Sequence, residues 1–424
     1  MVHPTRLQAA QERELGAALF ADPDVQKALQ RLEEVLSGRG FPERRRLLGE
    51  ALRLTRAMAP QVADALAACR DAIGYDAPVE LYLRRDPCEA AAVLHDSLGS
   101  SSIVLSSWLL EVLTPGELRA VIGHELGHVA LEHHRLRPQA LGGVNLETML
   151  KLFNWSRWAE ISADRVGMIC AGEVEHALVA EFKLVSGVSS TIVRPDLESL
   201  ARQADALAAA PSTVFPSSDD VLSTHPFMAI RARALLLFAR SQTCRVALGG
   251  QLGADVLPDE ALDELVGQDL QQMEANFLQS PGGASSFAKR LLYCAGFSVA
   301  GMCGEVDERE RSALASLLGA DAVEQFARQE RSRHGVWPRG RKTLGTAGAL
   351  AKVRAELEGL LDEARQRVSL ANRVHLVQLL CIVARADHEV APEEIEEMER
   401  IAVRLEVDPL VVAQTLRASA DPLD

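Results

Sequence analysis

The sequence has few basic residues and no long apolar run, and each shortage excludes a class of function. Its 45 lysines and arginines stand against 59 acids, which gives a formal net charge of −14, and the bases form no stripe. A nucleic-acid partner is not expected, because a phosphate backbone is bound through clustered positive charge. No apolar run approaches the roughly 18–20 residues that span a bilayer, so no membrane span is expected either.

Paired cysteines and a signal peptide are also missing. The seven cysteines are scattered, with no C-x-x-C pair among them, which argues against a disulfide framework. The sequence begins MVHPTRLQAAQERELGAALF, with Arg and Glu where a signal peptide needs an apolar run. These features predict a reduced, cytoplasmic protein.

Aromatic residues are scarce, and the composition favours helices. They make up 4% of the chain, whereas apolar residues together reach 48%, with many Ala and Leu. A length of 424 residues accommodates two or three domains. Positions 251–424 hold 29 acids and 19 bases, so −10 of the −14 net charge lies in this part.

Short strands and a capped helix surround the most informative stretch, VIGHELGHVALEHH at 121–134. The segments 78–84 and 101–107 contain clustered or alternating apolar and β-branched residues, which predicts strands. Thr114 opens the sequence T-P-G-E, a capping box with proline at the first helical position. The stretch therefore lies on a helix that begins near residue 115.

The order H-E-x-x-H in this helix predicts a metal site. His124 and His128 are four residues apart, hence on one helix face, where both can bind one ion. Zinc accepts imidazole and carboxylate ligands, and a catalytic zinc has three protein ligands and leaves its fourth position to water. Glu125 can act as general base toward that water. The motif also arises by chance, so a third ligand has to decide.

A third ligand is available in WAEISADRVGM, on a second helix predicted at about 146–171. Glu160 can complete the metal shell. Asp164, one turn further, can accept a hydrogen bond from the outer nitrogen of a ligand histidine and fix its tautomer. The alternative for both acids is a solvated helix face.

These stretches, together with STHPFMAIRARAL at 223–235, resemble the HtpX and CAAX-prenyl-protease family of gluzincin zinc metalloendopeptidases. The resemblance spans roughly 75–240. It implies one zinc ion per chain on the three ligands already named, with Glu125 as the base and Asp164 behind the ligands.

The resemblance also implies roles for two residues further along the chain. In the family pattern T-H-P-x-x-x-x-R, His225 lies near the active site and can stabilise an oxyanion, and Arg231 matches the arginine. A cap before the helix predicted at 226–242 is the alternative role for His225. His133 matches a common family position without being an expected ligand.

The family fold implies, in addition, that substrate pairs as an added strand along a sheet edge above the zinc. Membrane members of the family carry transmembrane helices, often between the second histidine and the glutamate. Here only 31 residues separate those two ligands and they cannot span a bilayer, so a soluble protein or peptide is the expected substrate. The residues predicted as the substrate edge are Ser102, Ile103, Val104 and Leu105.

In the C-terminal part, VAGMCGEVDERE at 299–310 aligns with VARADHEVAPEE at 383–394, which indicates an internal repeat. This part resembles the TerB-like helical domain of tellurite-resistance proteins. The predicted organisation is an N-terminal helical region packed on the peptidase (1–74), a metallopeptidase domain with a small sheet (75–246), a linker (247–260) and an all-α TerB-like domain (261–424).

The prediction is thus an α+β, mainly helical fold and a zinc-dependent endopeptidase. Its C-terminal domain is a candidate site for a protein partner. Two alternatives stay open. One is a non-catalytic metal-binding scaffold or peptide-binding protein. The other is a latent protease that is restrained by the C-terminal domain or by the Pro- and Ser-rich loop at 211–224.

Overall fold

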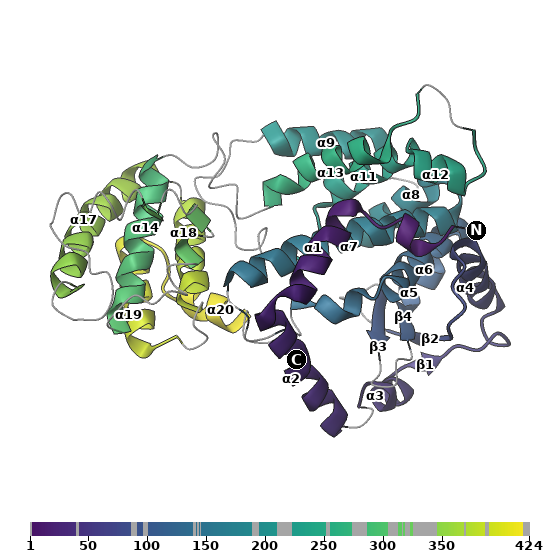
Figure 1. Cartoon of the computed structure of the whole chain (residues 1–424), viewed down its shortest axis with the longest axis horizontal. Coiled ribbons are helices and arrows are strands. Elements are labelled where there is room, and N and C mark those ends of the chain that lie inside the picture. The colour runs from purple at the N-terminus through teal and green to yellow at the C-terminus, as the bar shows by residue number, and fades with distance from the viewer. Residues whose placement is uncertain are drawn as a thin grey trace. The chain divides into compact units, whose positions relative to one another are not determined.

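The computed structural model divides the chain into two compact units (Figure 1). Unit 1 comprises Met1–Leu141, Asn154–Ala209 and Thr224–Leu270, and unit 2 comprises Gly142–Phe153, Ala210–Ser223 and Gln271–Asp424. The residues that the structure describes are 2–39, 42–85, 91–95, 101–138, 141, 144, 146–188, 195–209, 223–251, 255–273, 286–303, 313–315, 317–318, 323–324, 346–368, 370–385 and 390–418.

Unit 1 contains a four-stranded sheet with the strand order β1-β2-β4-β3. β2 and β4 run parallel, whereas β1 pairs antiparallel with β2 and β3 antiparallel with β4. The sequence predicted β2 and β4 but not the other two, because β1 has two residues and β3 begins with two alanines, which have low strand propensity. The strands are β1 (Leu52–Arg53), β2 (Val79–Arg84), β3 (Ala91–His95) and β4 (Ser101–Ser106).

The position of β4 corrects the predicted substrate edge. β4 is an inner strand, and Ile103 pairs with Leu81 of β2 on one side and with Val93 of β3 on the other. Its backbone N–H and C=O groups therefore serve the two neighbouring strands, and none remains for an added strand. The apolar run of Ser102–Leu105 reflects burial within the sheet instead.

Helices pack against this sheet, and the mainly helical α+β class is confirmed. Helix α6 lies against β3 and β4 and packs on α4 and α8. α6, α7 and α11 confirm the three helices predicted from the sequence around the metal motifs. The helices that belong wholly or mainly to unit 1 are α1 (Ala10–Ala21), α2 (Pro23–Arg39), α3 (Pro42–Glu50), α4 (Pro60–Ile73), α5 (Ser107–Val112), α6 (Pro115–Ala130), α7 (Leu146–Ala171), α8 (Val174–Ser186), α9 (Leu197–Ala209), α11 (Met228–Ala239), α12 (Gln242–Ala247) and α13 (Asp259–Leu270).

The linker predicted at 247–260 falls inside unit 1 rather than at its end. Helix α13 is tied to this unit by Asp263, which pairs with Arg165 and accepts a hydrogen bond from the backbone N of Ala10 at 2.8 Å. The linker was predicted from the Gly and Pro residues of 247–260, and such a composition gives no information on the buried contacts that the following helix makes. Unit 1 ends at Leu270.

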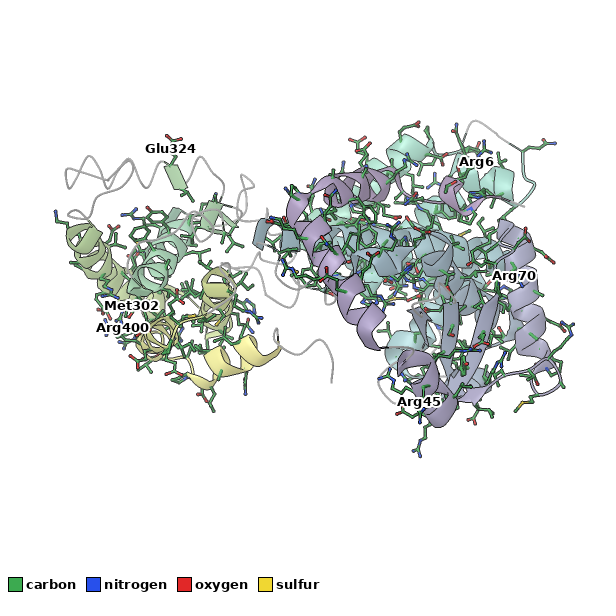
Figure 2. All side chains as sticks on the ribbon, turned by 60° about the horizontal axis from the view of Figure 1, so that its bottom comes forward. Arg6, Arg45, Arg70, Met302, Glu324 and Arg400 are labelled. Atoms are coloured by element: carbon green, nitrogen blue, oxygen red, sulfur yellow. The ribbon has the colours of Figure 1, made fainter. Side chains whose placement is uncertain are left out.

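The helices of unit 2 form a bundle around an apolar core that includes Leu357, Leu380 and Ile401. The buried carboxylate of Glu397 accepts a hydrogen bond from Ser298 Oγ at 2.5 Å and another from Arg400, which is labelled in Figure 2. The turns of the predicted repeat, 304–310 and 386–389, lie outside the described residues. The long helices are α14 (Ser286–Ala300), α17 (Thr346–Arg367), α18 (Leu370–Ala384), α19 (Pro392–Arg404) and α20 (Leu410–Ala418).

Within the part of the chain that the structure describes, no helix combines the length and the apolar character needed to cross a membrane.

Candidate metal centre

The motif helix α6 begins where the sequence predicted. Thr114 Oγ1 accepts a hydrogen bond from the backbone N of Glu117, and the Glu117 carboxylate accepts one from the backbone N of Thr114 at 2.8 Å, which completes the capping box. Lys183 of α8 donates to the same carboxylate at 2.7 Å. The start of α6 is thereby fixed to a neighbouring helix.

Glycines bring α6 close to α7. A Cβ at Gly123 would lie 2.5 Å from the Cβ of Cys170, and one at Gly167 would lie 2.7 Å from the backbone oxygen of Ala120. Real Cβ atoms do not approach so closely, so both positions require glycine. This contact of small residues sets Glu160 of α7 opposite the two histidines of α6.

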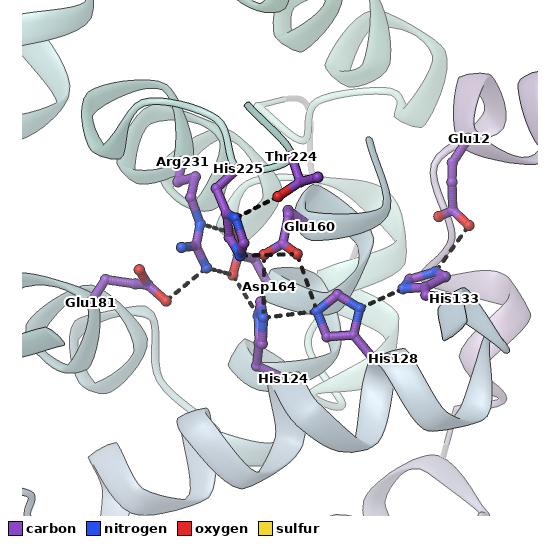
Figure 3. Close-up of polar contacts among 10 residues, drawn as sticks. All are labelled: Glu12, His124, His128, His133, Glu160, Asp164, Glu181, Thr224, His225 and Arg231. Carbon is purple, nitrogen blue, oxygen red and sulfur yellow. Dashed lines mark hydrogen bonds and ion pairs between the residues drawn. The ribbon is translucent and has the colours of Figure 1, made fainter. Parts of the chain in front are cut away.

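Three side chains meet in the space between these helices (Figure 3). His124 Nε2 lies 3.4 Å from Glu160 Oε2, His128 Nε2 lies 3.4 Å from Glu160 Oε1, and the two Nε2 atoms are 3.0 Å apart. Ligand atoms about 2.1 Å from one tetrahedral zinc ion lie roughly 3.4 Å from each other. Two imidazole nitrogens and a carboxylate at this spacing fit a zinc ion.

The charge states of the three groups also suit a cation. Burial lowers the pKa of His128 to about 4, which keeps this imidazole neutral. Burial opposes the ionisation of Glu160, but the surrounding imidazoles of His128, His225 and His124 lower its pKa well below the ordinary value. For His124, burial is outweighed by the hydrogen bonds and charges of Asp164 and Glu160, which raise its pKa. Positive charge is therefore favoured at this place, and a divalent metal supplies it.

Asp164 holds His124 from behind, as the sequence predicted for a residue one turn after Glu160. Its Oδ1 lies 2.9 Å from His124 Nδ1, which leaves Nε2 directed at the ligand cluster. Arg231 donates from Nε and Nη2 to the two oxygens of Asp164, at 2.8 and 2.6 Å. Arg231 Nη2 also lies 2.8 Å from Glu181 Oε1 of α8, an acid that the sequence did not single out.

A second chain of contacts leaves His128 on the opposite side of the cluster in Figure 3. His128 Nδ1 lies 2.8 Å from His133 Nδ1, and His133 Nε2 lies 3.0 Å from Glu12 Oε1. Glu12 comes from helix α1, more than a hundred residues before the motif, and no pattern in the sequence connects it with the histidines. The Nδ1 atom of each histidine in the cluster thus has a hydrogen-bond partner, which is Asp164 for His124 and His133 for His128.

Glu125 and His225 are the two remaining residues of the predicted catalytic site. Glu125 follows His124 on α6 and is buried. His225 Nε2 is 3.5 Å from Glu160 Oε1, while its side chain is 64% exposed. The N-cap of α11 is Phe227, so His225 is not the cap of this helix. The structure brings together His124, His128, Glu160, Asp164, His225 and Arg231, whereas Ser102–Leu105 lie in the inner strand β4.

Two protein families match parts of the sequence. Residues 58–152 match Peptidase family M48, and residues 291–416 match the Tellurite resistance protein TerB. The chain contains an M48 peptidase domain and a TerB domain. The M48 match includes His124, Glu125 and His128 and ends before Glu160, and both matches together support a metal-dependent peptidase with a helical C-terminal domain.

One relative adds to this evidence. The chain is 27% identical over 186 residues to a protein of Arabidopsis thaliana described as "Plastoglobule-localized metallopeptidase 48, chloroplastic". The similarity covers 40% of this chain and 54% of the plant protein, so the chain matches about half of that relative's length. No solved structure matches the sequence significantly.

Proposed function

We propose that this M48 protein is a zinc-dependent endopeptidase that hydrolyses peptide bonds of protein substrates. The observation that carries the proposal is the set of three mutually close ligand atoms on His124, His128 and Glu160, with Glu125 next to the first of them on α6. A structural zinc has no use for a base and usually has four protein ligands. Three protein ligands beside a glutamate are the arrangement of a hydrolytic site.

Each side chain has a role in the proposed reaction. When bound, zinc supplies Lewis acidity that polarises the substrate carbonyl and makes water acidic near neutral pH. Glu125 accepts the proton of the attacking water and delivers it to the leaving amine. Asp164 and Arg231 keep His124 in the tautomer whose Nε2 is available as a ligand. His225 stabilises the negative charge that develops on the carbonyl oxygen.

The substrate is proposed to bind along strand β3 in place of the inner strand that the sequence suggested. Among the described residues, β3 pairs with β4 alone and lies at one edge of the sheet, opposite to β1. β3 also lies against α6, the helix that carries the motif. An added strand is held by backbone hydrogen bonds, so extended or unfolded segments are the preferred substrates, with modest side-chain specificity.

The TerB domain is proposed to bind a protein partner, because among the described residues the ligand cluster lies outside the segment 291–416 that matches this family. A cytoplasmic location stays a prediction from the sequence. The two alternatives, a latent protease and a non-catalytic scaffold, also predict a bound metal ion. They differ from this proposal because neither predicts constitutive peptide hydrolysis.

Metal content and cleavage measured together test the proposal. Purified full-length protein should hold about one zinc ion per chain by elemental analysis and should cleave an unfolded protein such as casein. His124→Ala should lose both properties. His134→Ala is the matched control, since His134 belongs to the same part of the chain but not to the ligand cluster, and it should keep both.

Each failure has its own meaning. Reconstituted protein without a bound transition metal would refute the zinc site and the peptidase function with it. Zinc-loaded protein that leaves unfolded substrates intact would refute constitutive activity and favour the latent or scaffold alternative.

A further inference from the structure

Helix α1 presents one face to the metal centre. Glu12 and Gly16 are four residues apart on this face, and Glu12 is only 1% exposed. Just before the helix, the backbone N of Ala9 donates to Ser162 Oγ of α7 at 2.9 Å. This contact fixes the start of α1 close to the helix that carries Glu160.

The ring of His133 is held between α1 and α7. Its Nε2 lies 3.0 Å from Glu12 Oε1, and its centroid lies 5.6 Å from that of Trp155 in an edge-on arrangement. Trp155 in turn packs on Gly16, where an added Cβ would be 3.0 Å from the indole nitrogen. The backbone of Glu132 has a positive φ of 57°, and this turn after α6 brings His133 back toward α1. The two helices thus determine the orientation of the imidazole.

Metal binding fixes the protons along this chain of contacts. If His128 binds a metal through Nε2, its proton is on Nδ1 and is donated to His133 Nδ1, 2.8 Å away. His133 must then carry its own proton on Nε2 and donate it to Glu12 Oε1. Glu12 is therefore the final acceptor, and Gln8 Nε2 donates to the same oxygen at 2.6 Å.

We propose that Glu12 is a positioning residue of the metal centre, which holds His128 in its ligating tautomer and raises its basicity through His133. The proposal rests on the proposed zinc site and extends it to helix α1, outside the residues 58–152 that match the M48 family. Carboxylates behind ligand histidines commonly have this effect. Here the carboxylate acts across one intervening imidazole.

The ionised form of Glu12 is maintained by the same neighbours. Burial opposes ionisation, but hydrogen bonds from His133, Ser162 and Gln8 outweigh it and lower the pKa of Glu12. The support of His128 thereby mirrors that of His124, whose Nδ1 contacts Asp164 directly. Both ligand histidines thus have a buried carboxylate on their Nδ1 side. Asp164 of α7 contacts His124 directly, and Glu12 of α1 contacts His128 through His133.

Zinc affinity of the full-length protein tests this inference. Glu12→Gln keeps the shape of the side chain and removes its charge, whereas Glu12→Ala removes the acceptor as well. Glu14→Gln is the matched control, because Glu14 is exposed on the same helix two residues away. Zinc dissociation constants come from competition with a chromophoric chelator. The d–d absorption of the Co²⁺-loaded protein reports on ligand geometry, and thermal unfolding of the metal-free protein reports on folding.

We expect Glu12→Gln to weaken zinc binding about 10-fold and Glu12→Ala up to about 100-fold, the range found for residues behind metal ligands. The Co²⁺ spectrum should change in both, and Glu14→Gln should match wild type in every measurement. If Glu12→Ala does not fold, Glu12→Gln decides alone. Wild-type affinity in Glu12→Gln, or weaker binding with an unchanged Co²⁺ spectrum, would overturn the inference. Wild-type protein that binds no zinc would overturn the proposed function as well, so the two failures are distinct.

Discussion

Replacing Asp164 by Asn should weaken the metal site and the fold together. The carboxylate accepts three N–H groups, one from His124 and two from Arg231. An amide has only one oxygen, so its NH₂ group must face at least one of these donors. For a residue that orients a metal ligand, the expected loss of zinc affinity is roughly 10–100-fold, or about 1.4–2.7 kcal/mol.

The stability of the metal-free protein should also fall. Breaking a buried ion pair costs about 3–5 kcal/mol, and Asp164 and Arg231 are both largely buried. Arg231 keeps Glu181 at 2.8 Å as a second partner, so the lower end of this range, about 3 kcal/mol, is expected for Asp164→Asn.

A matched variant separates the two effects. Asp269 accepts from Nε and Nη2 of Arg233 at 2.8 and 2.6 Å, the same two-point geometry as the pair of Asp164 and Arg231, but it does not contact a histidine ligand. Asp269→Asn should therefore lower the unfolding free energy without changing zinc affinity. The assay is chelator competition for zinc, combined with denaturant unfolding of the metal-free proteins. Equal zinc affinity in Asp164→Asn and wild type would refute the assignment of Asp164 to the metal site.

Three further changes examine the base, the helix contact and unit 2. Glu125→Gln should retain about one zinc per chain and lose peptide hydrolysis, since it removes the base and no ligand; cleavage at the wild-type rate would disprove the role of Glu125. Gly167→Ala should cost about 1–3 kcal/mol of stability and weaken zinc binding, because the new Cβ would lie 2.7 Å from the backbone oxygen of Ala120. Thermal unfolding measures the stability and elemental analysis the zinc content, and wild-type values in both would contradict the close contact. In unit 2, burial opposes the ionisation of Glu397, but hydrogen bonds from Arg400 and Ser298 outweigh it and lower its pKa from 4.5. The ionised carboxylate therefore stabilises the fold fully above about pH 4.5, and this stabilisation is lost as the pH falls through the lowered pKa. The stability difference between wild type and Glu397→Gln should therefore shrink below about pH 4.5 in unfolding experiments, and a constant difference would exclude the ionic contribution.

Much of the candidate site could be predicted from local sequence. The spacing of His124 and His128 depends only on the helical repeat, and the capping box at Thr114 fixes where that helix begins. The predicted helices at 146–171 and 226–242 are also local features, and α7 and α11 occupy them. The histidines on one face of α6 and the acids on one face of α7 already suggest that the two helices bind one metal ion together.

Other features depend on contacts between distant segments and have no local pattern. The order of the sheet is one example, because the apolar sequence of Ser102–Leu105 is the same whether a strand lies at an edge or inside. The end of unit 1 at Leu270 is another, since it depends on the packing of α13 against α11 and α1.

The sequence by itself determined the candidate ligand types, their helical spacing, the carboxylate of Glu125 next to them and the two family domains, because short-range periodicity and residue chemistry are sufficient for these features. Only the tertiary structure decided which strands lie at the edges of the sheet, that Arg231 links Asp164 to Glu181 next to His124, and that Glu12 contacts His133. These contacts join residues that are far apart in the chain, and they form only when close packing at glycines such as Gly16 and Gly167 lets the helices approach one another.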